Sequence, residues 1–546
     1  MTLDEDHRSS SEDRPLDVLV VGAGPTGLVL AAELRALGGR LRLIDRQPDR
    51  VHESRALAIQ PRTLEVLARH GLTRELVDCG NPAVQLRMHL RRRTISLRLF
   101  DLGLSDTAYP YLLFLSQAET ERILGEHLAR HGILVERGAE LVSIDPTEED
   151  VTCRLRHHDG RHETVRASYV VGCDGARSTV RQRVGIAFEG DAYPQTFLLA
   201  DLEVDGLEPG AAHTWMTEAG MLFFFPLGCP ATWRLLAMRP PGDSDTTVTL
   251  GQLQAITHRH TGGLLRLHDP VWISDFRVQC RGASHYRAGR VFLAGDAAHV
   301  HSPAGAQGMN TGIQDAVNLG WKLALTCRGL ANPALPDSYE PERAPVGRVV
   351  LDFTDRAFTI AITHNPLLRL ARTQLVPRLA PLALRFAPAR RAAFRTISQL
   401  GIHYRNSPIT AEGPEPPRRG ARSGDRLPDA HITRDAQGCW LHEALAGKGF
   451  HLLLCGPAGA WDDGRLAALR ERHAGLLTVH RLTCDPIPGV LHDPSGEALA
   501  RLGVTHTAHH LVRPDGHIAY RNASTSLDGV ERFLAHWLPS TPGRRG

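Results

Sequence analysis

The feature that most constrains the fold is a glycine pattern that directly follows a short apolar segment. Residues 16–21 (LDVLVV) are rich in β-branched side chains, which predicts a buried parallel strand. Residues 22–27 (GAGPTG) have the spacing G-x-G-x-x-G, and residues 28–37 have helical character. A strand, a glycine turn and a helix in this order form the first unit of a doubly wound α/β fold. We therefore predict a Rossmann-like domain around this segment.

Each glycine of this pattern has its own physical task. Gly22 permits the tight turn, Gly24 lets a pyrophosphate approach the backbone, and Gly27 lets the helix pack closely on the strand. The helix N-terminus carries partial positive charge that favours phosphates. Asp45 stands at the end of the second predicted strand, residues 41–44, where an acid can bind ribose hydroxyls. The segment therefore predicts a dinucleotide site.

A second strand, acidic turn and helix occupy residues 289–324 (GRVFLAGDAAHVHSPAGAQGMNTGIQDAVNLGWKLA). Asp296 follows an apolar strand and can accept hydrogen bonds from hydroxyl groups. The amides of residues 308–310 lie where a helix begins near Thr311, so the positive end of its dipole points at them. This stretch predicts a site for a polyhydroxylated, partly anionic ligand.

Three further positions are candidates for the same ligand. Asp174 lies in a third acidic glycine turn, after the predicted strand 168–171, and the alternative is a simple capped turn into a helix. Arg55 follows the second strand and can reach phosphate or a cofactor ring, or can be a solvated surface residue. Gln117 follows the predicted helix cap Ser116, so its amide can bond a ligand.

Two later segments differ from this pattern. Residues 185–285 contain separate strand-like runs rich in aromatic and sulfur side chains, which indicates an inserted antiparallel layer. Such side chains form either ordinary core or the wall of a cavity for a flat apolar substrate. Residues 427–546 have their own strand and helix pattern. Residues 455–458 (CGPA) resemble a thioredoxin turn without the second cysteine, so no dithiol exchange is expected and the domain serves structure or assembly.

Composition excludes several classes of function. Lys+Arg number 63 and Asp+Glu 60, for a formal charge of +3, so nothing indicates nucleic acid or an anionic membrane as a partner. No run approaches the roughly 18 apolar residues that span a bilayer. The nine cysteines show no C-x-x-C pair, which favours a cytoplasmic protein with free thiols. His299 and His301 have no supporting ligand spacing, so we expect no metal site.

The three turns, at 22–27, 173–175 and 295–299, occur in the order found in class A flavoprotein aromatic hydroxylases, and PAGAQGMN at 303–310 is also similar to theirs. The resemblance covers about residues 16–348. The thioredoxin-like tail is similar to the subgroup of 3-(3-hydroxyphenyl)propionate, phenol and aromatic polyketide hydroxylases. The resemblance implies an α/β fold: a Rossmann-like FAD-binding domain with an inserted antiparallel-sheet substrate domain and a C-terminal thioredoxin-like domain.

The resemblance also implies domain boundaries. They are a disordered lead-in (1–15), the FAD-binding domain with a helical extension (16–184 and 286–407), the substrate-binding sheet (185–285), a proline- and glycine-rich linker (408–426) and the thioredoxin-like domain (427–546).

The resemblance further implies permanently bound FAD, NADPH or NADH as reductant, and O₂. Oxygen would reach a small aromatic substrate through a flavin C4a-hydroperoxide. Asp45 stands where the family usually has Glu, and Asp174 with Arg177 would support FAD and NADPH. No catalytic side chain is identified. The implied cofactor contacts are Gly22, Gly24, Pro25, Thr26, Gly27, Asp45, Arg46, Arg55, Gln117, Leu141, Asp174, Asp296, Pro303, Gly308, Met309 and Asn310.

Several alternatives stay open at this point. One is an FAD-dependent dehydrogenase that inserts no oxygen, and another is a monooxygenase that inactivates an antibiotic. A halogenase is disfavoured because the W-x-W-x-I-P signature is absent, and a flavin-binding scaffold without turnover is a further class. Residues 54–67 resemble the corresponding segment of the polyketide-type members of the family, and this resemblance favours a bulky or polycyclic phenolic substrate over a simple phenolic acid. A homodimer is compatible with the sequence.

Overall fold

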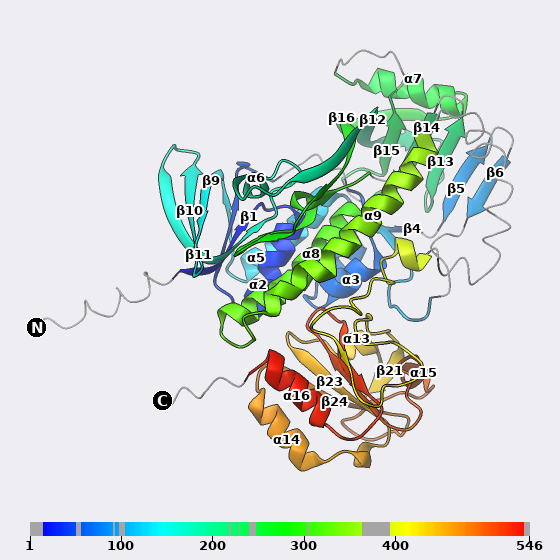
Figure 1. The fold of residues 1–546 in the computed structure, drawn as a ribbon. Helices are drawn as coiled ribbons and strands as arrows, with labels where there is room; N and C mark the ends of the chain where they lie inside the picture. Colours follow the sequence, from blue (N-terminus) through cyan, green and yellow to red (C-terminus); the bar gives the residue numbers. More distant parts are fainter. Residues whose placement is uncertain are drawn as a thin grey trace, which may run out of the picture.

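The computed structural model contains three eight-stranded sheets with their helices (Figure 1). The first two form the larger body, and the third, drawn in yellow to red, forms a separate domain at the C-terminal end. The predicted lead-in lies outside the described residues, apart from Pro15. The described residues are 15–50, 56–83, 85–90, 93–97, 104–217, 220–228, 230–239, 247–302, 305–362, 392 and 394–539.

The first sheet is the Rossmann-like core. Its parallel strands run in the order β18–β11–β1–β2–β8, with β17 at one edge and the antiparallel pair β9–β10 extending from β11. The strands are β1 (Leu16–Val21), β2 (Leu41–Asp45), β8 (Val135–Arg137), β9 (Ala139–Pro146), β10 (Val151–His157), β11 (His162–Gly172), β17 (Arg287–Ala288) and β18 (Val291–Leu293). The helices that accompany them are α2 (Pro25–Ala36), α5 (Gln117–Arg130), α6 (Thr179–Arg183), α8 (Gly308–Cys327) and α9 (Tyr339–Ile362).

The register of these strands brings the three predicted turns together. Val21 of β1 pairs with Ile44 of β2 and with Gly172 of β11. Gly172 in turn pairs with Leu293 of β18. The four strands therefore end at one level, and the turns that follow them meet at the carboxyl edge of the sheet, where ligands bind in open α/β folds.

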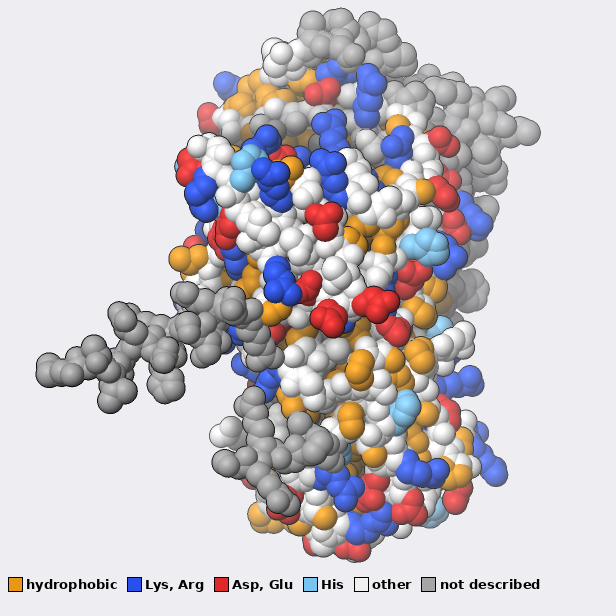
Figure 2. All heavy atoms as spheres, turned by 60° about the vertical axis from the view of Figure 1, so that its left-hand side comes forward, with side chains coloured by type: hydrophobic (Ala, Val, Ile, Leu, Met, Phe, Trp, Pro, Cys, Tyr) orange, Lys and Arg blue, Asp and Glu red, His pale blue; other side chains and the backbone are white. Residues whose placement is uncertain are grey.

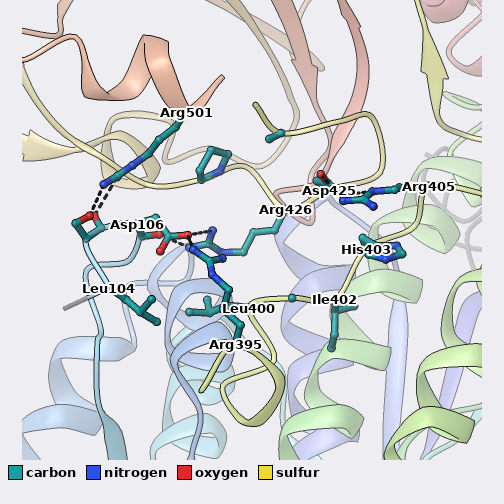
Figure 3. A pocket seen from close by; sticks show the side chains of 14 residues that line it. Leu104, Asp106, Arg395, Leu400, Ile402, His403, Arg405, Asp425, Arg426 and Arg501 are labelled. Carbon is teal, nitrogen blue, oxygen red and sulfur yellow. Dashed lines mark hydrogen bonds and ion pairs between the residues drawn. The ribbon is translucent and has the colours of Figure 1, made fainter. Parts of the chain in front are cut away.

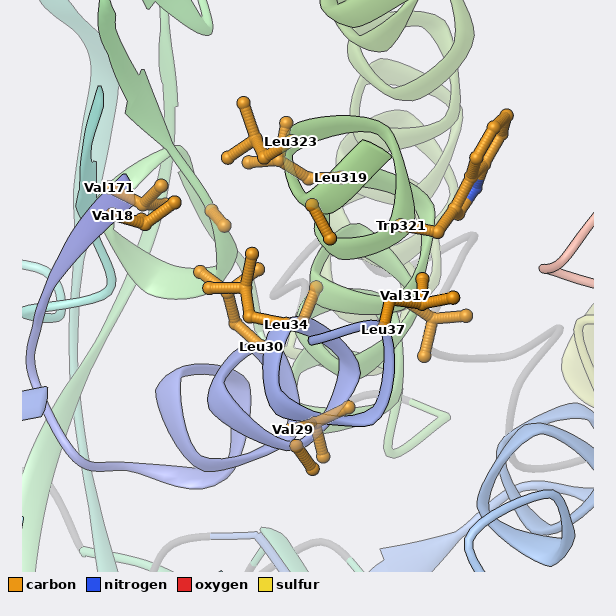
Figure 4. Packing of buried hydrophobic residues seen from close by; sticks show 14 of the residues in the cluster. Val18, Val29, Leu30, Leu34, Leu37, Val171, Val317, Leu319, Trp321 and Leu323 are labelled. Carbon is orange, nitrogen blue, oxygen red and sulfur yellow. The ribbon is translucent and has the colours of Figure 1, made fainter. Parts of the chain in front are cut away.

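Helices α2 and α8 pack on each other over this sheet (Figure 4). Leu30 and Leu34 of α2 lie toward Leu319 and Leu323 of α8, beside Val18 of the central strand, and all five side chains are buried. Burying each of these aliphatic side chains contributes about 1.5–3 kcal/mol in transfer free energy. The hydrophobic effect therefore fixes both helices against the sheet that carries the turns.

The second sheet is the predicted antiparallel layer, and it is wider than residues 185–285. Two strands from before residue 100 join it, because β5 pairs in parallel with β13. The order is β19–β16–β12–β15–β14–β13–β5–β6. The elements are β5 (Leu86–Leu90), β6 (Arg93–Leu97), β12 (Phe188–Asp205), β13 (Ala212–Thr217), β14 (Gly220–Pro226), β15 (Trp233–Met238), α7 (Leu250–Thr261), β16 (Arg266–Ala283) and β19 (His299–Val300).

The two faces of this sheet bury different partners, as strand alternation requires. On one face Trp233 and Leu235 of β15 form a cluster with Leu253 and Ile256 of α7. On the other face lies a cluster of apolar and aromatic side chains that includes Leu236. This second face is turned toward the first sheet. Its cluster contains Phe197, Leu199, Leu236 and Val278, with Tyr193, Phe223, Phe225, Met238, Trp272 and Phe276 packed against them.

The third sheet contains the predicted thioredoxin-like core. Parallel strands β23 and β24 are followed along the sheet by antiparallel β26 and β27, with α14 after β23 and α16 after β27. The elements are β20 (Ala411–Glu412), β21 (His431–Arg434), β22 (Gln437–Trp440), α13 (Leu441–Ala444), β23 (Phe450–Cys455), α14 (Asp463–Arg472), β24 (Leu477–Thr483), β25 (Leu491–His492), α15 (Glu497–Arg501), β26 (Ala508–Val512), β27 (Ile518–Asn522) and α16 (Asp528–Trp537).

The remaining cysteine of the thioredoxin-like turn is not exposed for exchange chemistry. Cys455 ends β23 in the core of the domain, and burial raises the pKa of its thiol well above the usual range. Ala458 begins a short 3-10 helix where a second cysteine would stand. A buried thiol that stays protonated is a poor nucleophile, so Cys455 is a core side chain of the domain and not an exchange thiol.

The other described elements are short, and several of them are buried. A small sheet and two helices lie beside the first two sheets, and no described helix is long and apolar enough to cross a membrane. Figure 2 shows basic and acidic side chains intermixed on one face of the molecule, consistent with the nearly balanced charge. These elements are β3 (Ala58–Ile59), α3 (Pro61–Ala68), α4 (Thr73–Cys79), β4 (Asn81–Ala83), β7 (Leu112–Phe114) and the 3-10 helix Leu335–Ser338.

Buried histidines in the C-terminal domain predict acid sensitivity. Burial lowers the pKa of His509 to about 4 and that of His510 to about 3. Unfolded histidine titrates near pH 6.5, so below that pH the unfolded chain binds protons that the folded domain excludes. The free energy of unfolding should therefore have its full value above pH 6.5. It should fall as the pH drops, by about 2 kcal/mol per histidine at pH 4.5.

Thermal unfolding followed between pH 7.5 and 4.5 measures this dependence. The His510→Gln variant should lose part of the slope, whereas His506→Gln, at an exposed position of the same domain, should keep it. A wild-type midpoint that does not change across this range would contradict the prediction.

Candidate active site

The carboxyl edge of the first sheet opens on a cavity of about 300 Å³. Its lining comes from the glycine turn, the helix start of α5, the acidic turns after β11 and β18, the start of α8 and strand β16 of the second sheet. The cavity therefore lies between the two sheets. Of the predicted cofactor contacts, it brings together Gly24, Pro25, Thr26, Gln117, Asp296, Gly308 and Met309.

The three glycines of the first turn meet different surroundings. Gly22 has φ +104°, and a Cβ there or at Gly27 would overlap backbone atoms of Cys173 or Gly22, respectively. A Cβ at Gly24 would meet no described atom within 4 Å. Gly24 also caps α2 without a side-chain hydrogen bond, so the first amides of that helix lie at the open side of the turn. This is the space and the donor set that a pyrophosphate needs.

Asp45, at the end of the second strand, holds the glycine turn that follows the first strand. Its two carboxylate oxygens accept hydrogen bonds from the amides of Ala23 (2.7 Å) and Gln47 (2.8 Å), and Arg137 lies 3.8 Å away. Asp45 and its exposed neighbour Arg46 do not line the cavity, although both stand at the same edge of the sheet. Each carboxylate oxygen has a second lone pair, so Asp45 retains the capacity to accept from a hydroxyl.

Buried charged side chains fix the acidic turn after β18. Gly295 has φ +62°, and its amide donates to Oδ2 of Asp315 (3.0 Å), which also accepts from Nε2 of His299 (2.7 Å). The Arg343 guanidinium donates to Oδ1 (2.6 Å). Burial opposes the charge of Asp315, but Arg343 and His299 lower the pKa of its carboxyl below the usual range. Asp296 is thereby placed, exposed, at the cavity.

Helix α8 presents its N-terminus to the same cavity. Its N-cap Gln307 makes no capping bond through its side chain, and that side chain instead donates to the carbonyls of Gly305 (3.0 Å) and Ile397 (2.8 Å). The amides at Gly308 and Met309 therefore lie at the positive end of a long helix dipole with the cavity in front of them. Such a helix start stabilises negative charge.

Three predicted contacts have other tasks in the structure. Asp174 caps α6 by accepting from Ser178 Oγ (2.5 Å) and the amides of Thr179 (2.6 Å) and Val180 (3.1 Å), so the capped-turn alternative describes its side chain. The cavity receives its neighbours Cys173, Gly175 and Ala176 instead.

Asn310 and Leu141 are also predicted contacts that do not line the cavity. Asn310 is buried and bridges the carbonyls of Ala58 and Ala306, both at 2.8 Å, while accepting from the Gln60 amide. Leu141 is buried in β9 opposite Leu155 of β10, so it belongs to the core. Two other predicted contacts, Arg55 and Pro303, lie outside the described residues.

The sheet side of the cavity adds residues that the sequence did not single out. Phe276 and Val278 line it and belong to the aromatic face of the second sheet. On this face the buried Arg234 pairs with Asp201 (2.6 and 2.7 Å) and donates to the carbonyl of Ala56 (2.8 Å). A charged residue inside the apolar run WRLLAM was the available signal, because an unpaired buried arginine would be very costly.

One titratable cavity residue has a defined tautomer. Nδ1 of His301 donates to the carbonyl of Ser302 (3.0 Å), which leaves Nε2 as an acceptor. Among the described groups Nε2 has no hydrogen-bond partner. Burial lowers the pKa of His301 to about 4, so the ring is neutral at pH 7. From the sequence, His301 is considered only together with His299 as a metal ligand, and no other ligand spacing supports that interpretation.

Comparison with known proteins agrees with this geometry. A family model described as "FAD binding domain" matches residues 15–354, and one described as "Aromatic-ring hydroxylase, C-terminal" matches residues 421–541. The chain is 38% identical to 6-methylpretetramide 4-monooxygenase of Streptomyces rimosus, across 96% of this chain and 95% of that protein. It is 33% identical to pentachlorophenol 4-monooxygenase of Sphingobium chlorophenolicum, across 76% of each chain.

Solved structures show the same architecture. Anhydrotetracycline hydroxylase OxyS from Streptomyces rimosus superposes with a TM-score of 0.76 at 30% identity, covering 97% of this chain and all of that one. Aklavinone-11 hydroxylase in complex with FAD and aklavinone gives a TM-score of 0.77 at 27% identity, covering 96% of this chain and 99% of that one. The three turns meet at one edge of the sheet and both domain models match, so the chain belongs to the class A flavoprotein aromatic hydroxylases and is an FAD-dependent monooxygenase.

Proposed function

We propose that the protein uses NADPH or NADH and O₂ to hydroxylate the electron-rich ring of a polycyclic phenolic compound of the aromatic polyketide type. The observation that carries this proposal is the broad aromatic and apolar face of the second sheet, which continues into the FAD cavity through Phe276 and Val278. The relatives' names support the class: those of two relatives contain 6-methylpretetramide and anhydrotetracycline, which are polycyclic phenolic compounds.

The glycine turn and α2 fit the pyrophosphate and adenosine part of FAD. The open space at Gly24 and the uncapped amides of α2 suit two phosphates. Asp45 would accept from the adenosine ribose with its remaining lone pairs while its existing bonds to Ala23 and Gln47 hold it in place. Its carboxylate is shorter than the glutamate common in the family, and those two main-chain bonds support the short acid in the required position.

The second helix fits the flavin end of the cofactor. Asp296 is exposed at the cavity and would accept from ribityl hydroxyls. The start of α8 at Gly308 and Met309 would place its positive dipole end beside the flavin oxygens that become negative on reduction. Gln117 also lines the cavity and donates to Glu121 (2.8 Å), which orients its amide.

Bound FAD supplies the redox chemistry and the activation of O₂. The protein's own contribution is to orient the substrate ring and exclude water. Aromatic side chains of the second sheet suit a flat substrate because offset ring stacking adds about 0.5–1.5 kcal/mol per pair. Neutral His301 offers an acceptor nitrogen for a hydrogen bond from the phenolic hydroxyl, which would orient the ring.

The described cysteines form no disulfide with one another, which together with the use of a nicotinamide reductant supports a cytoplasmic location. A monooxygenase that inactivates an antibiotic and one that acts in a biosynthetic route would carry out the same hydroxylation. A substrate panel distinguishes them.

Substrate-dependent turnover tests the proposed function. Purified yellow protein should oxidise NADPH or NADH faster when a polycyclic phenol is present, because the substrate occupies the aromatic face beside the flavin. The product should gain one oxygen atom by mass spectrometry. Simple phenols and phenolic acids form the matched panel and should stimulate less. Accelerated oxidation with a dehydrogenated product and no added oxygen would refute oxygen insertion and support the dehydrogenase alternative.

A pair of glycine variants tests the cofactor site. Gly24→Ala should leave the fold intact, since its Cβ meets no described atom within 4 Å, yet it should fill the space meant for pyrophosphate. We expect the FAD dissociation constant to rise by about 100-fold or more, corresponding to about 3 kcal/mol of lost charge-assisted bonds. Gly27→Ala should instead lower the melting temperature of the protein freed of FAD, because its Cβ overlaps the Gly22 carbonyl.

Fluorescence titration with FAD and melting of the FAD-free protein separate the two effects. Equal FAD affinity in Gly24→Ala and wild type would show that the pyrophosphate lies elsewhere.

A further inference from the structure

The buried charges behind the FAD cavity continue into the C-terminal domain. Arg343 of α9 is fully buried and bonds in three directions. It donates to Asp315 Oδ1 (2.6 Å), to the carbonyl of Thr311 in the first turn of α8 (3.0 Å), and to the hydroxyl of Tyr404 (2.9 Å). Asp315 in turn accepts from the amide of Gly295 (3.0 Å). Only two side chains therefore separate Tyr404 from the turn that places Asp296.

Tyr404 is held in place by the C-terminal domain. Its ring packs on His517, with centroids 4.3 Å apart, and the guanidinium of Arg513 lies 5.3 Å from the ring centroid. Its amide donates to the carbonyl of Gly424 (2.7 Å). Figure 3 shows the next residue, Arg405, beside Asp425, to which it donates at 2.6 Å. The position of Tyr404 therefore follows the position of the C-terminal domain.

The same domain is also bonded directly to α8 and α9. Arg513 donates to both carboxylate oxygens of Glu342 (2.6 and 2.9 Å), the residue before Arg343. Glu342 also accepts from Lys322 of α8 (2.7 Å). Burial opposes the charge of Glu342, but Arg513 and Lys322 lower its pKa to about 2. These fully buried ion pairs lose much free energy if one partner moves, so the domain cannot shift independently of the two helices.

We propose that Tyr404 is a positioning residue through which the C-terminal domain fixes the Gly295–Asp296 turn and the start of α8 for FAD binding. The proposal rests on the proposed function, because it assigns that turn to FAD. Arg343 is the intermediary: it bonds both the carboxylate that holds Gly295 and the carbonyl of Thr311. A thioredoxin-like domain without exchange chemistry thereby acquires a role in the cofactor site.

The physical reason is the cost of an unsatisfied buried donor. Without the Tyr404 hydroxyl, one guanidinium N–H of Arg343 has no acceptor among its described partners in a site closed to water. Arg343 must then shift, and Asp315 and Gly295 shift with it. Gly295 is sensitive to such movement because it sits at φ +62°, packed against Thr26.

Tyr404→Phe removes only the hydroxyl and keeps the ring on His517. The FAD dissociation constant should rise by about fivefold to tenfold, the size expected for the net contribution of one typical hydrogen bond. Tyr520→Phe is the matched control: Tyr520 is equally buried in the same domain, and its hydroxyl has no hydrogen-bond partner among the described groups. Its FAD affinity should equal that of the wild type.

Hydrogen exchange in the FAD-free proteins gives the second measurement. The Gly295 amide should exchange faster in Tyr404→Phe and at the wild-type rate in Tyr520→Phe. A lower melting temperature for Tyr404→Phe with unchanged FAD affinity and unchanged Gly295 exchange would mean a merely structural role and would overturn the proposal. Wild-type protein that binds no FAD would refute the cofactor assignment itself, a result visible before any variant is made.

Discussion

The close contact of α2 with α8 is the constraint on which the rest of the cofactor site depends. Glycine makes it possible at Gly312, where a Cβ would lie 2.4 Å from Thr26 Oγ1, and at Gly320, where it would lie 2.5 Å from Glu33 Cβ. At these two positions a side chain on α8 would not fit between the helices. Both N-termini consequently open on one cavity, and their dipoles concentrate positive potential where a dinucleotide carries its phosphates and its reduced flavin.

The local parts of this arrangement were predictable from the sequence, and the tertiary parts were not. A strand, a glycine turn and a helix are encoded within about thirty residues, so the edge of the sheet and the position of Gly24 follow from spacing. The direction of a side chain depends on what packs around it. Asp174 turns to its own helix start, and Asn310 ties the loops around it, although both have residue types suited to a ligand. Sequence spacing alone does not distinguish these two outcomes.

Residues 408–426 show a second limit. Their proline, glycine and charge content is typical of a flexible linker, yet Ala411 and Glu412 pair with Tyr520 and Arg521 at the edge of the third sheet. An ion pair between Arg521 and Glu412 (2.8 Å) accompanies the pairing. Composition describes the tendency of an isolated segment, whereas the neighbouring edge strand supplies hydrogen bonds that the segment cannot make alone.

The interface with the C-terminal domain is built from buried charged side chains. Glu342, Arg513 and Lys322 are fully buried, and such groups seldom stabilise a fold more than apolar residues of the same size would. Their benefit is geometric, because each bond fixes a direction and a distance. An interface built from them holds α8 and α9 in one register against the third sheet. That is the property needed if the domain sets the position of a cofactor site.

The two faces of the second sheet have different surroundings, so one face can vary in sequence while the other stays the same. Strand alternation gives one face of β15 to α7 and the other to the cavity, so substitutions on the cavity face leave the α7 core unchanged. The buried pair Arg234–Asp201 lies on the cavity face and bonds the Ala56 carbonyl of the FAD-binding domain. It ties the wall to the cofactor domain, while the aromatic residues around it can change with the substrate. Variation of the residues that face the substrate is therefore compatible with a wall held in one position on the FAD-binding domain.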